Sequence, residues 1–227
     1  MKRRLAAIVL AVSLTTLSLV GAGERPPGFA DLRAIDPTIR QDIRYATDNN
    51  FTRSVVPGYV APACILAEPV AKALAQVQKA LKPQQLGLQV FDCYRPSRAV
   101  KFFVAWASEK GKPDPEYYPE FARNTLIAKG YIAARSGHSS GGSIDLTLGK
   151  LTPTGFEALD MGTDFDFFDP RSHTRSKAVS AEALANRQLL VKAMQQAGFA
   201  NYDREWWHFS FRKEPFAGKA FDFDVRE

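Results

Sequence analysis

The sequence predicts a single α+β domain in which a mainly antiparallel sheet is flanked by helices. Segments expected to form strands and helices do not alternate strictly along the chain, which disfavours a doubly wound parallel sheet. No internal repeat, low-complexity tract or linker rich in glycine, serine or proline follows residue 22. A leader takes 22 of the 227 residues, and the 205 that remain are enough for one domain with a sizeable core.

Residues 1–22 have the order of a secretory signal peptide. Three cations at positions 2–4 precede an apolar stretch from Leu5 to Val20, and small residues follow, so we place the cleavage after Ala22. The stretch is shorter than the roughly 20 apolar residues of a membrane-spanning helix. We therefore expect an exported, periplasmic protein without a stable membrane anchor after cleavage.

The charge of the chain is modest once the leader is removed. The formal net charge falls from +6 to +3, because the leader carries three cations and no anions. No cluster of lysine or arginine remains of the kind that binds nucleic acid. The composition therefore predicts no nucleic-acid partner, and it leaves the oligomeric state open.

The first half of the domain is expected to contain two strands and two helices. Alternating apolar residues predict a strand from Thr38 to Tyr45, and an apolar stripe at helical spacing predicts a helix from Leu66 to Leu81. The apolar run from Leu86 to Phe91 predicts the second strand. Ser97 is then expected to cap a helix that ends near Gly111.

The second half is expected to begin with a helix from Glu116 to Lys129. A glycine-rich loop then leads into a strand from Ser143 to Leu148. The helix from Ala181 to Ala197 is expected to end at Gly198, and a last strand covers Trp207 to Phe211.

The chain has two cysteines, Cys64 and Cys93. In an exported protein such a pair favours a disulfide, and two separate buried thiols are the alternative. Zinc binding by the pair is disfavoured, because their spacing matches no finger or ribbon motif.

Two short stretches carry the residues best suited to chemistry. In SGHSSGGSIDLTL, His138 and Asp145 flank a glycine-rich loop, and their side chains can meet only if the glycines fold the chain back. A solvated loop before an ordinary strand is the alternative. In REWWHFSF, Glu205 lies three residues before His208, and both face one site only if the last strand starts irregularly.

These four side chains have the composition of a hydrolytic zinc site. His138, Asp145 and His208 would supply two nitrogens and one oxygen, and such a zinc commonly keeps three protein ligands and one water. Glu205 would remain as the base for a metal-activated water.

Three further features have open interpretations. Arg95 follows an apolar strand in FDCYRPSR, where it could stabilise a developing oxyanion or form a surface ion pair with Asp92. The segment from Asp164 to Pro170 fits either an amphipathic strand or a pocket wall. His173 lies in a polar loop and is expected not to bind metal.

Five segments together resemble the zinc D-alanyl-D-alanine dipeptidases, within the wider family of zinc D,D-peptidases. They are DIRYATDNNF from Asp42, DCYRP from Asp92, SGHSSGGSIDLTL from Ser136, MGTDFDFFDPRSHT from Met161 and EWWH from Glu205. They span most of the chain after the leader. The resemblance implies a small α+β fold whose antiparallel sheet carries one zinc ion per chain.

The resemblance also implies a role for each site residue. The zinc ligands would be His138, Asp145 and His208. Glu205 would be the catalytic base, and Arg95 would stabilise the tetrahedral intermediate. Substrate-binding positions would be Tyr45, Asp92, Ser136 and Asp166, with Asp166 meeting the substrate ammonium and Ser136 other polar groups.

We therefore expect an exported zinc metallopeptidase that hydrolyses the small dipeptide D-Ala-D-Ala to free D-alanine. One alternative is a D,D-carboxypeptidase or endopeptidase that acts on larger peptidoglycan peptides, and a cleft narrowed at 51–59 or 165–168 would disfavour it. Another is a non-catalytic cell-wall-binding zinc protein. Glu205 and Arg95 disfavour the latter, since metal binding alone needs neither.

Overall fold

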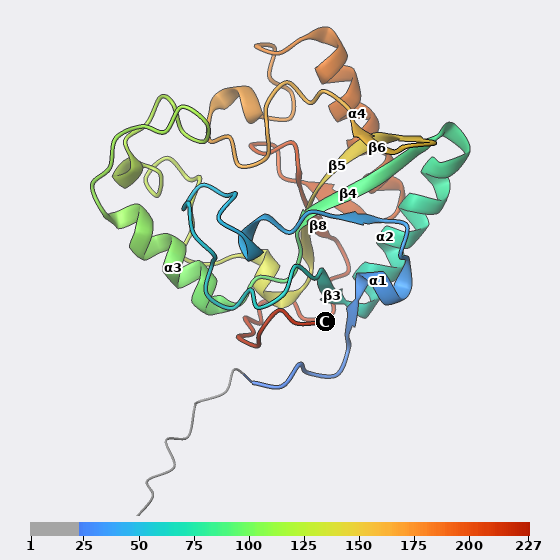
Figure 1. Ribbon diagram of the computed structural model, residues 1–227, viewed down its shortest axis with the longest axis horizontal. Coiled ribbons are helices and arrows are strands. Elements are labelled where there is room, and N and C mark those ends of the chain that lie inside the picture. The colour runs from blue at the N-terminus through green and yellow to red at the C-terminus, as the bar shows by residue number, and fades with distance from the viewer. Residues whose placement is uncertain (1–22) are drawn as a thin grey trace, which may run out of the picture.

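The computed structural model describes residues 23–227, so the predicted signal peptide lies outside the described residues. The described chain has an α+β fold with a mostly antiparallel six-stranded sheet, which confirms the predicted class (Figure 1). The strand order is β2-β4-β5-β8-β7, and β6 pairs with the C-terminal part of β5. The strands are β2 (Arg40–Gln41), β4 (Leu86–Asp92), β5 (Ser143–Thr152), β6 (Gly155–Ala158), β7 (Phe199–Asn201) and β8 (His208–Phe211).

A smaller two-stranded sheet forms near the start of the described chain. Its antiparallel strands are β1 (Phe29–Asp31) and β3 (Ile65–Ala67). The short helix α1 (Leu32–Ile35) follows β1, and the carboxylate of Asp31 caps it by accepting from the backbone N–H of Arg33.

The main helices lie on different sides of the central sheet (Figure 1). Helix α2 (Glu68–Leu81) packs against β4 and against helix α4 (Ala181–Gln196). Helix α3 (Ser97–Ser108) lies apart from α2 and α4. Gln78 of α2 fixes one of these contacts, because its Oε1 accepts a 2.8 Å hydrogen bond from the backbone of Leu88. Within residues 23–227 we find no helix with the length and apolarity needed to cross a bilayer.

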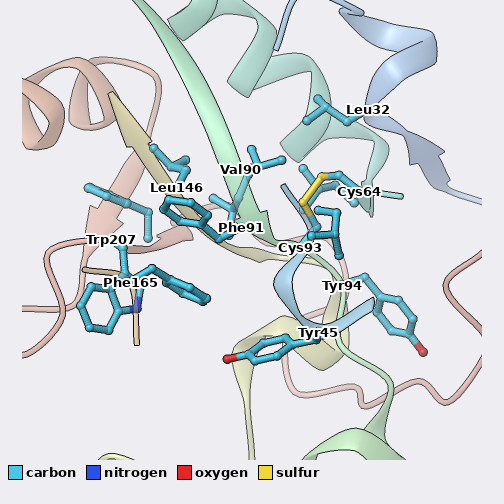
Figure 2. Packing of buried hydrophobic residues seen from close by; sticks show 14 of the residues in the cluster. Leu32, Tyr45, Cys64, Val90, Phe91, Cys93, Tyr94, Leu146, Phe165 and Trp207 are labelled. Carbon is cyan, nitrogen blue, oxygen red and sulfur yellow. A yellow bond between two sulfur atoms is a disulfide. The ribbon is translucent and has the colours of Figure 1, made fainter. Parts of the chain in front are cut away.

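The disulfide expected from the cysteine pair is present. Cys64 and Cys93 are bonded, with their Cα atoms 5.3 Å apart, and both are buried. The bridge lies in the core among the residues drawn in Figure 2. It joins the residue before β3 to the residue after β4, so it ties the small sheet to the central one.

Some predicted elements differ from the structure. The strand expected from Thr38 to Tyr45 is reduced to the two residues of β2, followed by the 3-10 turn η1 (Arg44–Ala46). The alternating apolar residues that predicted a strand are explained by the burial of Ile39 and Ile43 in the core. No long strand pairs at this segment.

The helix expected from Glu116 to Lys129 is wrong. The segment forms turns and the short 3-10 helix η3 (Arg123–Thr125). Asp114 starts a turn instead, because its carboxylate accepts from the backbone of Glu116, and Pro119 has no N–H to donate within a helix.

The predicted capping role of Ser97 is also wrong. Pro96 occupies the cap position of α3 without a side-chain hydrogen bond, and Ser97 is the first helical residue. The backbone N–H of Ser97 instead donates to the carbonyl of Phe221. The end of α4 agrees with the prediction, since Gly198 follows it in a left-handed conformation at φ +92°.

The last residues of the chain pack across the molecule without forming a helix. Phe223 stacks on Tyr94 with ring centroids 3.9 Å apart, and the backbone of Val225 bonds with residues 58, 60 and 61. The N–H of Phe221 donates to the carbonyl of Ser139, which lies in the 3-10 turn η4 (Gly137–Ser140). The C-terminus therefore holds segments that are far apart in sequence.

Candidate active site

The three side chains expected to bind metal lie together. His138 comes from η4, Asp145 from β5 and His208 from the start of β8. Nε2 of His138 lies 3.1 Å from Nδ1 of His208. Oδ1 of Asp145 lies 3.3 Å from the first nitrogen and 2.9 Å from the second. The pairing of β5 with β8 places Asp145 directly opposite His208.

The glycine-rich loop turns His138 back towards the strand. The Ser136 hydroxyl oxygen accepts from the backbone N–H of His138 at 3.3 Å and so starts η4. Gly141 ends the turn with φ +76°, and a Cβ there would lie 2.4 Å from the ring of Phe29. Glycine is therefore required at the reversal that brings His138 near Asp145.

These donor atoms fit a tetrahedral metal ion. Ligands about 2.0–2.2 Å from a tetrahedral centre are about 3.3–3.6 Å from one another, slightly more than the separations of 2.9–3.3 Å found here. Nδ1 of His138 lies 2.6 Å from the carbonyl oxygen of Cys93, to which it donates. Nε2 therefore carries no proton, and its lone pair is free to bind a metal ion. Two imidazoles and one carboxylate leave a fourth position open.

Asp92 lies next to His138, one of the candidate metal ligands, and does not line the cavity. Its fully buried carboxylate accepts from the hydroxyl of Tyr59 at 2.6 Å and from Nε of Arg95 at 2.9 Å. It also lies 3.5 Å from Nδ1 of His138. Asp92 is therefore placed to orient Arg95 and His138. No pattern in the sequence singles out Tyr59 as a partner of Asp92, since only the folded chain brings the two together.

Arg95 occupies a fixed position on the cavity wall. Its guanidinium lies 2.8 Å from Asp92 and 3.5 Å from Asp145, and over the rings of Tyr45 and Phe103 at 5.2 Å each. The pair with Asp92 exists, but it is buried and not the surface pair considered above: the Arg95 side chain is 14% exposed. A positive charge is thus held in place beside the candidate metal ligands.

Glu205 lines the same cavity as His208. The backbone N–H of His208 donates to the carbonyl of Glu205 at 3.2 Å, so a turn precedes β8. This confirms the irregular start that a shared site requires. Burial raises the pKa of Glu205 to about 7, while the nearby His208 and Arg95 act in the opposite direction. A carboxylate with such a pKa can both accept and release a proton near neutral pH.

Tyr45 and Asp166 form a buried polar pair on the cavity wall. The hydroxyl of Tyr45 donates to Oδ2 of Asp166 at 2.8 Å. Burial raises the pKa of both groups well above their ordinary values. Asp166 has a left-handed backbone, at φ +59°, within the turns that replace a strand in the segment from Asp164 to Pro170. That segment is therefore a pocket wall.

The cavity beside these groups is small. Its volume is about 230 Å³, below the roughly 300–1,000 Å³ typical of sites for drug-sized ligands. Phe51 and Phe168, from the two stretches expected to narrow the cleft, line it, whereas Tyr59 and Phe165 do not. The remaining wall includes Ser136 as expected and also Trp207, together with residues that the sequence did not indicate: Phe103, Tyr131, Arg135 and Tyr202. His173 is not among the described residues that could share a metal ion.

Known proteins of one family are similar to this chain along almost all of its described residues. A family model described as D-Ala-D-Ala dipeptidase matches residues 25–226. A D-alanyl-D-alanine dipeptidase from Enterococcus faecium is 40% identical over 201 residues, which cover 88% of this chain and 98% of that protein. A protein of the same name from Streptomyces coelicolor is 40% identical over 199 residues, or 87% and 98% of the two chains.

A more distant relative, from Escherichia coli, is also named D-alanyl-D-alanine dipeptidase. It is 32% identical over 181 residues, which cover 80% of this chain and 83% of that protein. The match extends across the segments that supply the three candidate metal ligands, Glu205 and Arg95. The chain is therefore a peptidase that belongs to the D-Ala-D-Ala dipeptidase family.

Proposed function

We propose that the protein hydrolyses D-Ala-D-Ala to two molecules of D-alanine, with one zinc ion held by His138, Asp145 and His208. The observation that supports this most is the position of Glu205 and Arg95 beside those three ligands, in a cavity of about 230 Å³. Zinc in that position would lower the pKa of a water towards roughly 7 and polarise the scissile carbonyl.

The side chains then have separate tasks. Glu205 takes a proton from the attacking water and passes it to the amine as the C–N bond breaks. Water supplies the oxygen added to the carbonyl carbon, so the products are two amino acids. Arg95 stabilises the negative charge that develops on the carbonyl oxygen, and its ion pairs hold it there before substrate binds.

Asp166 and Tyr45 are suited to the substrate ammonium. A buried carboxylate whose pKa is raised is stabilised as the anion when a cation binds next to it. Tyr45 holds that carboxylate through its hydroxyl group. Ser136 uses its oxygen as an acceptor, which leaves its O–H free to donate to another polar group of the substrate.

The size of the cavity favours a dipeptide over a longer peptide. Phe51 and Phe168 form part of its wall, and neither can move away without disturbing their contact at 5.1 Å between ring centroids. The disulfide supports the further proposal that the protein is exported, because such bonds persist mainly outside the reducing cytosol.

The test is an assay of D-alanine release together with metal analysis of the purified protein. Zinc should be bound at one ion per chain, and a chelator should abolish release until zinc is returned. A peptidoglycan pentapeptide ending in D-Ala-D-Ala should be cleaved much more slowly than the free dipeptide. Zinc-loaded protein that leaves D-Ala-D-Ala intact would contradict the proposal, and faster cleavage of the pentapeptide would favour a carboxypeptidase.

A further inference from the structure

The carboxylate of a bound dipeptide needs a partner close to the metal-binding residues. One residue separates the scissile carbonyl from that carboxylate, a distance of roughly 3.3–3.6 Å along an extended chain. A carboxylate taken from water into a small cavity needs a charged or hydrogen-bonding partner to offset its desolvation. Among the residues that line the cavity, two carry a permanent positive charge: Arg95 and Arg135.

Arg95 is already paired with protein carboxylates. It lies 2.8 Å from Asp92 and 3.5 Å from Asp145, and most of its side chain is buried. Its guanidinium is directed at those acids and at the place where the scissile carbonyl would lie. A second carboxylate on Arg95 would compete with these bonds, so Arg95 is a poor partner for the substrate terminus.

Arg135, by contrast, is not paired with a carboxylate within residues 23–227. It is exposed, yet it lines the cavity, so it lies at the opening. Within residues 23–227 its side chain makes no ion pair within 4.0 Å and no hydrogen bond. Arg40 and Arg212 are also exposed and unpaired within residues 23–227, but neither of them lines the cavity.

The position of Arg135 in the chain also fits this role. It lies three residues before His138, so their Cα atoms are at most about 10–11 Å apart. The long arginine side chain can cover much of that distance. The adjacent Ser136 has a hydroxyl proton free to donate, so a carboxylate at this position would meet two neighbouring donors.

We propose that Arg135 binds the C-terminal carboxylate of the substrate and thereby selects dipeptides whose C-terminus is free. Guanidinium and carboxylate groups match in a planar, two-bond geometry, which makes the pairing specific as well as favourable. The inference rests on the proposed function, in which Asp166 receives the ammonium. The site then recognises both terminal charges of a zwitterionic dipeptide.

The test compares two substrates on matched variants. The substrates are D-Ala-D-Ala and its C-terminal amide, and the variants are Arg135→Ala, Arg135→Lys and, as control, Arg175→Ala. The Arg175 side chain is 90% exposed and does not line the cavity. Arg135→Ala should lower kcat/KM for the free acid by about tenfold to a hundredfold, mainly through KM, and leave the amide almost unaffected. Arg135→Lys should retain part of the preference, and Arg175→Ala should retain all of it.

Other outcomes overturn the proposal in different ways. Equal losses on the acid and the amide would show that Arg135 maintains the cavity without binding the carboxylate. No loss on either substrate would place the carboxylate elsewhere. If the wild type cleaves neither substrate, the proposed function fails. In that case calorimetric binding of D-Ala-D-Ala to wild type and Arg135→Ala still tests Arg135, since equal affinities would refute its role.

Discussion

Nδ1 of His138 lies 2.6 Å from the carbonyl oxygen of Cys93, the residue that the disulfide joins to Cys64. That contact fixes which ring nitrogen faces the metal position. The next residue is also held, since the N–H of Tyr94 donates to the carbonyl of Ile65 at 2.8 Å. The bridge therefore lies at the point in the core that orients His138, one of the proposed metal ligands.

Removing the bridge should weaken metal binding as well as folding. For Cys64→Ala combined with Cys93→Ala, we expect zinc affinity to fall about 10- to 100-fold, because the Cys93 carbonyl is less firmly placed. The free energy of unfolding should fall by about 2–5 kcal/mol. Competition with a chelator, at a temperature where both proteins are folded, measures the affinity.

Val77→Ala is the matched control for the disulfide variant. Val77 is buried in α2, away from the segment that carries Cys93, and its truncation should cost about 1–3 kcal/mol. This variant should lose stability and keep its zinc affinity. If the disulfide variant does the same, the bridge has no part in orienting His138.

Replacing Glu205 should separate metal binding from catalysis. Glu205→Gln keeps the shape of the side chain but cannot accept a proton, so we expect zinc to be retained and kcat to fall by at least about 100-fold. His208→Ala should lose both zinc and activity, because it removes one of three ligands. Metal content and D-alanine release measured on the same preparations check this. A Glu205→Gln enzyme of normal activity would remove the base assignment.

Replacing Asp166 should affect substrate binding more than turnover. Asn tolerates the left-handed backbone at this position and can still accept from Tyr45, so Asp166→Asn removes little besides the charge. We expect KM for D-Ala-D-Ala to rise about tenfold to a hundredfold. Asp164→Asn, two residues earlier and exposed, should leave KM unchanged in the same assay. An unchanged KM in the Asp166 variant would place the ammonium elsewhere.

The ion pair formed by Asp169 and Arg171 should make the free energy of unfolding depend on pH in the acidic range. Burial raises the pKa of Asp169, but the hydrogen bonds from Arg171 outweigh it and hold the pKa below its ordinary value. A carboxyl with a lowered folded pKa stabilises above its unfolded pKa of about 4, and this stabilisation is lost as pH falls further. Because Arg171 is partly exposed, the effect should be at most about 1 kcal/mol.

Urea unfolding of wild type and Asp169→Asn between pH 3 and 7 measures this contribution. Asparagine can keep the cap at the backbone of Arg171 and loses only the charge. The difference in free energy of unfolding should be constant above about pH 5 and shrink below about pH 4. A difference that stays the same at all pH values would mean that the charge does not contribute.

The clustering of His138, Asp145 and His208 could be predicted because their side chains are chemically distinctive. The chain has three histidines, and two of them lie in distinctive stretches: His138 in a glycine-rich loop that leads to Asp145, and His208 just after Glu205 at the last strand. The core strands β4 and β5 could also be predicted, since they are continuous apolar or alternating runs. The secondary structure of these two strands, and of helices α2 and α4, follows from the spacing of apolar residues along the sequence.

Other features depend on contacts that no local pattern encodes. The sequence does not show that Tyr59 meets Asp92, or that a backbone carbonyl at Cys93 orients His138. The segment from Glu116 to Lys129 looks helical by composition, but the turn at Asp114 and the buried Tyr117 decide otherwise. The short strands β6 and β7 exist only because longer partners are beside them.

The packing of the C-terminus sets the order in which the site can be assembled. The carbonyl of Ser139, next to His138, receives its hydrogen bond from Phe221, six residues before the end of the chain. Because synthesis proceeds from the N-terminus, the loop that carries His138 lacks this support until the chain has been made as far as Phe221. A chain truncated before Phe221 would carry all the proposed ligands and the proposed base, and would still lack the segment that holds the loop in place.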